Sequence, residues 1–382
     1  MEEFLYLKIY NDLKDSIISG DIENGSKLPT EKQLGEKYAV SRITAIKAMQ
    51  KLENEGYIKR VRGSGTFVTY NDVSTFSNSG ISLNMNSKNI AFVADCSLDI
   101  VFYILSCFQK IAISHGYNVS IFDTSSSSTN EDEILQTVST GNFCGIVCRP
   151  KNVYSNIPVF LSIINRKIPL VFVDSNIPML RVPCVTSNNF IGGYMITNLL
   201  IEYGHRDIAV LFSDFTNLNE QERFGGYVRA LSEHKIDFKS ENLLISPKDE
   251  GDDGMYMFEY SEMQRKESHI GFKEKLNSVI GRPNAPTAIF CMYDKLASFV
   301  EQYAIELGCQ IPERLSIVGY NNASICEQMI IPLTSVDQNY NKIAGTAFDI
   351  ILDMIGGKKA HLQNLIEPML CKRKSLINQQ LP

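Results

Sequence analysis

The stretch LPTEKQLGEKYAVSRITAIKAMQKLENEG, residues 28–56, decides how the amino-terminal part of the chain folds. Thr30 is a favourable helix N-cap, and Gln33 three residues later completes a capping box, so one short helix begins here. After a tight turn, Ser41 is placed to cap a second helix over residues 42–55. Two short helices joined by a tight turn predict a helix-turn-helix.

The second helix has two different faces when its residues are spaced at about 100° around the axis. The apolar face, which is predicted to pack inward, consists of Ala45, Ala48, Met49 and Leu52. The opposite face consists of Ile43, Ile46, Lys47 and Gln50, with Arg42 and Thr44 at its edges. Because glutamine can read adenine, lysine a guanine or a phosphate, and an apolar side chain a thymine methyl, this face suits a DNA major groove. Packing of the same face against another domain is the alternative that stays open.

The next segment, YIKRVRGSGTFV at residues 57–68, contains two short β runs on either side of Gly63 and Gly65. This pattern predicts a hairpin, or wing. Its basic side chains, among them Arg60 and Arg62, can meet phosphates, and the glycines allow the backbone to approach a minor groove.

Charge is unevenly distributed in this chain of 382 residues, whose net charge is −6. Residues 30–62 carry eight Lys and Arg against four Asp and Glu, which concentrates basic charge on the helix-turn-helix and the wing. Nine cysteines without a CxxC pair and five scattered histidines predict reduced thiols and no metal site. No apolar run reaches the roughly 18 residues of a membrane helix. The amino terminus is acidic where a signal peptide is basic, so no membrane association and a cytoplasmic location are expected.

Composition divides the chain into three regions, which are the helix-turn-helix and wing over residues 1–69, a linker over 70–88 and a third region over 89–382. The linker is rich in Ser and Asn and shows no periodicity. The third region alternates apolar runs with amphipathic stretches, which is typical of parallel sheets with crossover helices. The predicted strands are Ile90–Asp95, Val119–Asp123, Phe143–Cys148, Leu170–Asp174, Ile208–Phe212, Asn242–Ile245, Ala288–Met292 and Ser316–Gly319. The fold class is therefore α/β, with two doubly wound lobes behind the winged helix-turn-helix.

Residues 6–68 resemble the winged helix-turn-helix of the GntR family. The matching stretches are Tyr6, Ile18-Ser19-Gly20, Leu28-Pro29-Thr30-Glu31, Val40-Ser41-Arg42, Thr44 and Gly63-Ser64-Gly65-Thr66-Phe67-Val68. The resemblance implies DNA contacts by Glu31, Arg42, Thr44 and the wing around Arg62 and Gly63. With the outward helix face added, the expected DNA-binding residues are Glu31, Ser41, Arg42, Ile43, Thr44, Ile46, Lys47, Gln50, Arg60, Arg62 and Gly63. Ile46 stands where the family usually has Arg, so a thymine-rich contact is predicted there.

Residues 89–372 resemble the sugar-binding region of the LacI/GalR family, which is itself similar to periplasmic sugar-binding proteins. The motifs are Ile168–Asp174, Tyr203–Ala209, Glu222–Tyr227, Tyr293-Asp294, Ser316–Asn322 and Pro332–Val336. A GntR headpiece on such a core resembles the arrangement of the AraR-type arabinose repressors. The resemblance implies a two-lobed, periplasmic-binding-protein-like domain that binds a small carbohydrate between its lobes.

Asp95, Asp174 and Asp294 fall at the carboxyl ends of predicted strands, and other polar residues join them as candidates for the ligand site. Ligands of doubly wound sheets bind outside the carboxyl ends of the strands, and a polyol needs paired donors and acceptors beside an apolar platform. The candidates are Asp95, Tyr103, Arg149, Asp174, Arg223, Asp294, Asn321 and Gln338. By resemblance, Asp174, Arg223 and Asp294 are the strongest sugar contacts. Helix or turn capping by Asp174 and Asp294, and a structural salt bridge for Arg223, remain alternatives. Asn321 stands where the family usually has Asp, which leaves the ligand's identity open.

These features predict a sequence-specific transcriptional regulator that is not an enzyme and needs no cofactor. It is expected to bind a near-palindromic double-stranded operator as a homodimer, with operator affinity controlled by the carbohydrate. Repression relieved by the sugar is the default that the resemblance implies. Two alternatives are a nucleoside or other non-sugar effector, and a regulator fused to a pyridoxal-phosphate enzyme.

Overall fold

The computed structural model of the protein describes residues 2–18, 21–22, 25–38, 40–54, 57–61, 65–68, 87–125, 131–151, 156–213, 216–246 and 262–379. The chain forms two compact units, residues 1–82 and 83–382, and each is described here by itself. Most of the predicted linker, residues 70–86, lies outside the described residues, as do Arg62 and Gly63 of the predicted wing.

The first unit is a three-helix domain with a two-stranded hairpin. Its elements are α1 (Glu2–Ile18), α2 (Glu31–Tyr38), α3 (Arg42–Asn54), β1 (Ile58–Val61) and β2 (Gly65–Val68). The hairpin is antiparallel and pairs Ile58 with Val68. The predicted inner face of α3 is confirmed, since Ala45, Ala48, Met49 and Leu52 are fully buried in the core of this unit.

Side-chain caps define where α2 and α3 begin. The capping box at α2 is confirmed: the Thr30 backbone N–H donates to Gln33 Oε1 at 2.9 Å, and the Gln33 N–H donates to Thr30 Oγ1 at 3.4 Å. At α3, the Thr44 N–H donates to Ser41 Oγ at 3.2 Å, as predicted for a cap. Each cap satisfies a backbone donor that the helix itself leaves unpaired, so the turn between the two helices is held by its own sequence.

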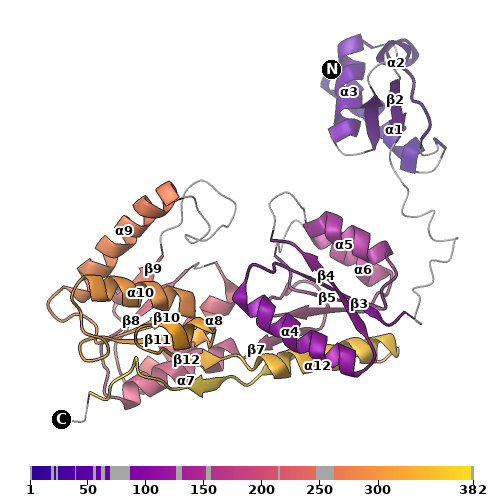
Figure 1. The fold of residues 1–382 in the computed structure, drawn as a ribbon. Coiled ribbons are helices and arrows are strands. Elements are labelled where there is room, and N and C mark those ends of the chain that lie inside the picture. The colour runs from indigo at the N-terminus through magenta and orange to yellow at the C-terminus, as the bar shows by residue number, and fades with distance from the viewer. Residues whose placement is uncertain are drawn as a thin grey trace. The chain divides into compact units, whose positions relative to one another are not determined.

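The second unit contains two six-stranded sheets, each the centre of one lobe (Figure 1). In sheet order, the first lobe contains β13 (Gln363–Ile366), β7 (Cys184–Ser187), β6 (Leu170–Val173), β5 (Gly145–Cys148), β3 (Asn89–Ala94) and β4 (Asn118–Asp123), all parallel. Helices α4 (Asp99–Ser114) and α12 (Tyr340–Ile355) pack together in one hydrophobic cluster of this lobe. Helices α5 (Glu131–Thr140) and α6 (Ile157–Asn165) belong to a second cluster.

The second lobe repeats this architecture with a different set of strands. Their order is β14 (Met369–Cys371), β12 (Thr334–Asp337), β11 (Ser316–Asn321), β10 (Ala288–Cys291), β8 (Ile208–Phe212) and β9 (Leu243–Ile245). Only β14 runs antiparallel to its neighbour among these described strands. The helices are α7 (Asn189–Glu202), α8 (Leu218–Glu233), α9 (Glu262–Ile280), α10 (Asp294–Glu306) and the short α11 (Ile325–Gln328).

The described chain passes between the two sheets at three places. It crosses at residue 188 between β7 and α7, at residues 338–339 between β12 and α12, and at residues 367–368 between β13 and β14. Each lobe is therefore assembled from segments that are far apart in the sequence. Within the described parts of the chain, no helix has the length and apolarity needed to cross a bilayer.

Candidate DNA-binding face and ligand-binding residues

The outward face of α3 presents polar side chains to solvent. Lys47 and Gln50 are exposed and Ile46 is half-buried, while Arg42 is exposed where the helix begins. The side chain of Ile43 lies outside the described residues. These side chains stand opposite the buried face of the helix, so they are available to a major groove.

Thr44 and Ser41 are engaged with each other at the start of α3. Thr44 is only 6% exposed, and its Oγ1 lies 2.7 Å from Ser41 Oγ, so the two hydroxyls share a hydrogen bond. Ser41 itself is exposed. The pair therefore positions the first turn of the helix, and a DNA contact by Thr44 remains a prediction.

Arg60 ties the hairpin to both helices of the helix-turn-helix. Its guanidinium lies 3.6 Å from Glu31 Oε1 at the start of α2 and 3.3 Å from Glu53 Oε2 near the end of α3. Its backbone N–H also donates to Glu53 Oε1 at 3.2 Å. These exposed pairs are worth little to stability, but they orient strand β1 against the helices.

Arg149 and Asp174 meet at the carboxyl ends of neighbouring strands in the first lobe. Arg149 follows β5 and Asp174 follows β6, and Arg149 Nε donates to Asp174 Oδ2 at 2.7 Å. Asp174 is 2% exposed and adopts a left-handed backbone conformation with φ of 60°. That conformation is uncommon for a residue with a Cβ atom and is concentrated at functional positions.

Arg223 lies in the second lobe on α8 and is buried. Its Nε donates to Asn189 Oδ1 at 2.9 Å, and its Nη1 donates to the carbonyl of Met292 at 2.5 Å. The guanidinium carbon sits 3.7 Å from the centre of the Tyr320 ring, a close cation–π contact. The contacts of Arg223 are thus made to an amide, a carbonyl and an aromatic face.

Asp294 begins α10 and is completely buried. Its Oδ2 accepts from the Ala323 N–H at 2.7 Å, and its Oδ1 accepts from Ser335 Oγ at 2.6 Å. Burial raises the pKa of this carboxyl to about 6, partly offset by these hydrogen bonds. The carboxyl therefore anchors the segment that follows β11, next to Asn321 at the end of that strand.

Asn321 and Gln338 form a pair at the ends of β11 and β12. Gln338 Nε2 donates to Asn321 Oδ1 at 2.6 Å. Gln338 Oε1 is buried and makes no hydrogen bond of normal geometry, and the same holds for Ser187 Oγ and Tyr320 OH. Thr124 Oγ1, after β4, is a fourth such atom, and the Tyr320 hydroxyl interacts with Ser187 and Arg223. Because buried polar atoms are nearly always satisfied, Gln338 Oε1 beside Asn321 indicates a place where a polar ligand can complete the hydrogen bonding.

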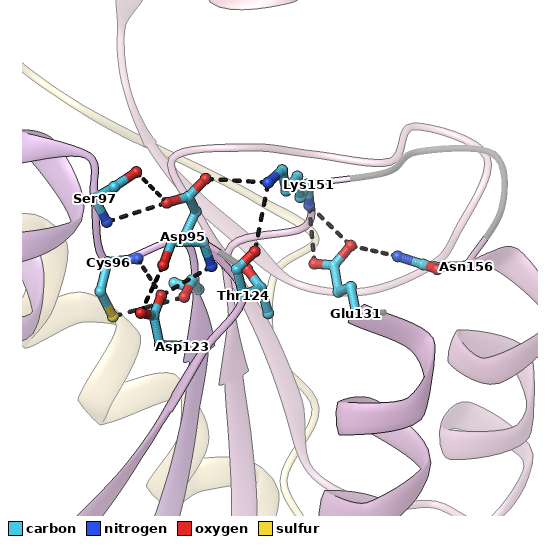
Figure 2. A network of polar contacts seen from close by, with 10 residues as sticks. Asp95, Cys96, Ser97, Asp123, Thr124, Glu131, Lys151 and Asn156 are labelled. Atoms are coloured by element: carbon cyan, nitrogen blue, oxygen red, sulfur yellow. Dashed lines mark hydrogen bonds and ion pairs between the residues drawn. The ribbon is translucent and has the colours of Figure 1, made fainter. Parts of the chain in front are cut away.

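Asp95 belongs to a separate polar network at the ends of β3 and β4 (Figure 2). Its Oδ1 accepts from the backbone N–H and the hydroxyl of Ser97 at 3.1 and 2.5 Å, and its Oδ2 lies 3.4 Å from Lys151 Nζ. The buried carboxylate of Glu131 accepts from the Lys151 backbone N–H at 2.9 Å and from the Asn156 side-chain amide. The network holds the residues after β5 beside those after β3.

Tyr103 lies on α4 and contacts the second lobe. Its hydroxyl oxygen accepts a hydrogen bond from the Ser324 backbone N–H at 2.7 Å. Its ring stacks on that of Tyr340, with centroids 5.1 Å apart and planes 22° apart.

Two asparagines that the sequence did not single out connect the candidates across the lobes. Asn219 Nδ2 donates to the Asp174 carbonyl at 2.9 Å, and Asn189 Nδ2 donates to Asn219 Oδ1 at 3.2 Å. Since Asn189 also accepts from Arg223, a continuous chain of hydrogen bonds joins Asp174 to Arg223. Both asparagines lie in the first turn of a helix, where a capping role would explain them, so the sequence carries no distinct signal for this connection.

The structure thus brings Arg149, Asp174 and Arg223 into one connected set and places Asn321 beside Gln338. Asp95 sits in its own network, and Tyr103 is occupied by a contact between the lobes. Among the residues that the structure describes, no group of three or more His, Cys, Asp or Glu is arranged to hold a metal ion.

Comparison with known proteins agrees with both parts of this architecture. Residues 5–68 match the family model described as bacterial regulatory proteins, gntR family. Residues 197–376 match the model described as a periplasmic binding protein-like domain. The chain is therefore a transcriptional regulator that joins a GntR-type DNA-binding domain to a periplasmic-binding-protein-like domain.

Among characterised proteins, the chain is similar to two arabinose metabolism transcriptional repressors. The one from Geobacillus stearothermophilus is 25% identical over 356 residues, which cover 92% of this chain and 91% of the relative. The one from Halalkalibacterium halodurans is 27% identical over 358 residues, covering 92% and 90%. A solved LacI family transcriptional regulator from Enterococcus faecium with bound ribose superposes with a TM-score of 0.61 at 20% identity. It covers 76% of this chain and all of its own length, and this likeness shows the fold.

Proposed function

We propose that the protein is a transcriptional repressor whose operator affinity is controlled by a small carbohydrate bound between the lobes of its second unit. The observation that carries this proposal is the connected polar set of Arg149 and Asp174 at strand ends of the first lobe and Arg223 on α8 of the second lobe. It offers donors and acceptors from both lobes beside the ring of Tyr320, which is the combination that a polyol requires.

The donors and acceptors in this set suit a ligand rich in hydroxyl groups. Asp174 is paired with Arg149, and Arg223 is held by neutral acceptors and the Tyr320 ring. The unsatisfied atoms of Gln338 and Ser187 add neutral hydrogen-bonding capacity. Arabinose and ribose are the first sugars to test. A relative of similar sequence is named as an arabinose metabolism repressor, and a regulator of the same fold holds ribose.

On the DNA side, the proposal assigns α3 to the major groove and the hairpin β1–β2 to the adjacent minor groove. A homodimer would place two such domains on the half-sites of a near-palindromic operator. Residues 1–69 would form the DNA-binding domain, 70–88 the linker and 89–382 the effector domain, in the cytoplasm. The chain would act by binding rather than by catalysis, with no cofactor.

Coupling between the sites follows from the connections between the lobes. Asp174 and Arg223 come from different lobes, so a sugar that contacts both stabilises one relative placement of the lobes. If the sugar changes the affinity of the protein for DNA by some factor, DNA changes the affinity for the sugar by the same factor. Release of the operator on sugar binding is the expected sign.

A thermal-shift screen of the full chain against aldoses, sugar acids, disaccharides and nucleosides tests the effector class. At about a hundred times its dissociation constant, a ligand adds roughly 2.7 kcal/mol to native-state stability and raises Tm visibly. A pentose or hexose hit, followed by loss of operator binding in a mobility-shift titration, supports the proposal. A hit confined to nucleosides replaces the carbohydrate with that class, and sugar-tightened operator binding reverses the sign.

A further inference from the structure

Two stacked tyrosines of the first lobe both reach the same short segment of the second lobe. The Tyr103 hydroxyl accepts from the Ser324 N–H at 2.7 Å, and the Tyr340 hydroxyl donates to the carbonyl of Asn321. Tyr103 and Ser324 are 221 residues apart in the sequence. The two rings are nearly parallel, so each fixes the orientation of the other.

The two contacts differ in what movement of the lobes would do to them. Tyr340 begins α12 directly after a crossing between the sheets, so its contact with Asn321 lies at the hinge itself. Tyr103 is on α4 and stacks on Tyr340, but its partner Ser324 belongs to the other lobe and is 221 residues away along the chain, so only the placement of the lobes keeps this pair together. Opening of the lobes therefore breaks the Tyr103 bond, whereas the Tyr340 bond can persist.

The Ser324 N–H has a particular need for this acceptor. Ser324 is the N-cap residue of the short helix α11, and its own side chain makes no capping hydrogen bond. The Tyr103 oxygen supplies an acceptor for a backbone donor that would otherwise depend on water. In return, the bond leaves the Tyr103 hydroxyl proton free to donate to another acceptor.

We propose that the Tyr103 hydroxyl is a latch that holds the two lobes closed by binding the Ser324 N–H, with Tyr340 orienting its ring. Tyr103 is then a positioning residue that sets the ratio of closed to open protein. Its hydroxyl affects sugar binding by holding the lobes together rather than by contacting the sugar. This inference rests on the proposed function, because it assigns the latch to the control of the same sugar site.

Removing the hydroxyl while keeping the ring is the direct test. A neutral hydrogen bond of ordinary net strength corresponds to about a five-fold change in an equilibrium. Tyr103→Phe should lower the closed-to-open ratio by about that factor. If the closed form binds the sugar, the apparent Kd rises by up to the same factor as the closed fraction falls.

The matched control is Tyr194→Phe. Its hydroxyl donates to Glu233 Oε2, also at 2.7 Å, but both residues belong to the second lobe. The atomic change and the length of the lost bond are the same, but the Tyr194 bond stays within one lobe and is donated to a carboxylate, so its loss costs at least as much without touching the contact between the lobes. Tyr103→Leu, which also removes the ring, separates the latch from a role of the ring as a sugar platform.

Three measurements on the full chain complete the test. Hydrogen exchange of the Ser324 amide, sugar affinity by calorimetry and the sugar concentration that releases the operator should all change about five-fold in Tyr103→Phe and stay unchanged in Tyr194→Phe. Unchanged Ser324 exchange in Tyr103→Phe would overturn the latch. So would normal sugar affinity in Tyr103→Phe combined with loss in Tyr103→Leu. If the wild-type chain bound no sugar, the proposed function would fail, while Ser324 exchange would still decide whether the latch exists.

Discussion

Arg149 and Asp174 form a short ion pair, 2.7 Å between Nε and Oδ2, although each belongs to a different strand end of the first lobe. Asp174 is almost completely buried and the Arg149 side chain is largely so. A buried charge that loses its partner is costly, so each of the two residues holds the other in place. The pair also presents Asp174 to Asn219 of the second lobe, which makes it part of the boundary where the sugar is expected.

Asp174→Asn should weaken sugar binding by about ten-fold, because a hydrogen bond to a charged group is replaced by a neutral one. Isothermal titration of the full chain measures the change. Glu233→Gln is the control, since it neutralises an exposed carboxylate that pairs with Arg229 far from the strand ends. An unchanged sugar Kd in Asp174→Asn would place the ligand elsewhere.

Lys47→Ala should weaken operator binding by about ten-fold, because Lys47 is an exposed cation on the outward face of α3. Mobility-shift titrations at several salt concentrations separate the two modes of contact. If Lys47 contacts a phosphate, its loss reduces the slope of log affinity against log salt concentration by about one and weakens binding to all sequences alike. If Lys47 contacts a base, its loss weakens binding to the operator only. Lys342→Ala removes the same charge from α12 and should leave DNA affinity unaltered.

Ile46 should select a thymine, since its side chain offers only a methyl contact from a half-buried position on α3. In vitro selection of operators with the wild-type chain should therefore enrich an A·T pair at this position. Ile46→Arg should shift the preference to guanine, which arginine binds with two hydrogen bonds. A wild-type requirement for guanine at that position would contradict the prediction.

Gly193→Ala should destabilise the second lobe by about 3 kcal/mol, because α7 and α8 touch through their glycines. A Cβ atom at Gly193 would lie 2.0 Å from the Arg223 carbonyl oxygen, a backbone atom that cannot move without shifting α8. Gly271→Ala is the opposite case, since among the described residues no atom outside its own stretch of α9 lies within 4 Å of the added carbon. That substitution should stabilise by about 0.5–1 kcal/mol. Denaturant unfolding followed by circular dichroism compares the two.

His205 should make the protein less stable as the pH falls from about 6.5 toward 4. Burial lowers the pKa of His205 to about 4, and its ring contacts Thr287 and the carbonyl of Ile377. In this window the unfolded chain binds a proton that the folded chain excludes, so unfolding is favoured at the lower pH. His205→Gln should flatten this part of the profile of Tm against pH.

The comparison must be made as a difference between wild type and His205→Gln at each pH. Asp294 contributes with the opposite sign, because its raised pKa makes the folded chain the better proton binder between about 4 and 6. That contribution is common to both proteins and cancels. Parallel profiles for the two proteins would show that His205 does not titrate as its burial implies.

Long, regular elements of this fold could be predicted from the sequence. Apolar runs such as Leu170–Val173 and the capping residues Thr30 and Ser41 carry local signals, and the structure confirms them. Strands β7, β12, β13 and β14 were not predicted. They are about as short as the predicted Leu170–Val173, but their places are determined by pairing with distant strands rather than by their own pattern.

The charged residues of the candidate site could be predicted from the sequence, but the hydrogen bonds that connect them could not. Asp174 stood out by its position after a strand and Arg223 by the family resemblance, yet Asn219 and Asn189, which join them, have the pattern of ordinary helix-start residues. Thr44 was placed at the edge of the DNA-binding face, and the structure shows it buried against Ser41. Contacts such as Tyr103 with Ser324 depend on how two lobes meet, and no local sequence pattern encodes that.

The second crossing of the chain, at residues 338–339, has a consequence for synthesis on the ribosome. The first lobe begins with β3 but is completed only by α12 and β13, which are translated after nearly all of the second lobe. Until then, the surface of α4 around Phe108 lacks Phe348, its partner at 5.7 Å. Domains usually fold in the order in which they emerge, but this lobe must wait for its neighbour. A nascent chain that stops before residue 340 therefore leaves the first lobe unfinished, and the two lobes mature together.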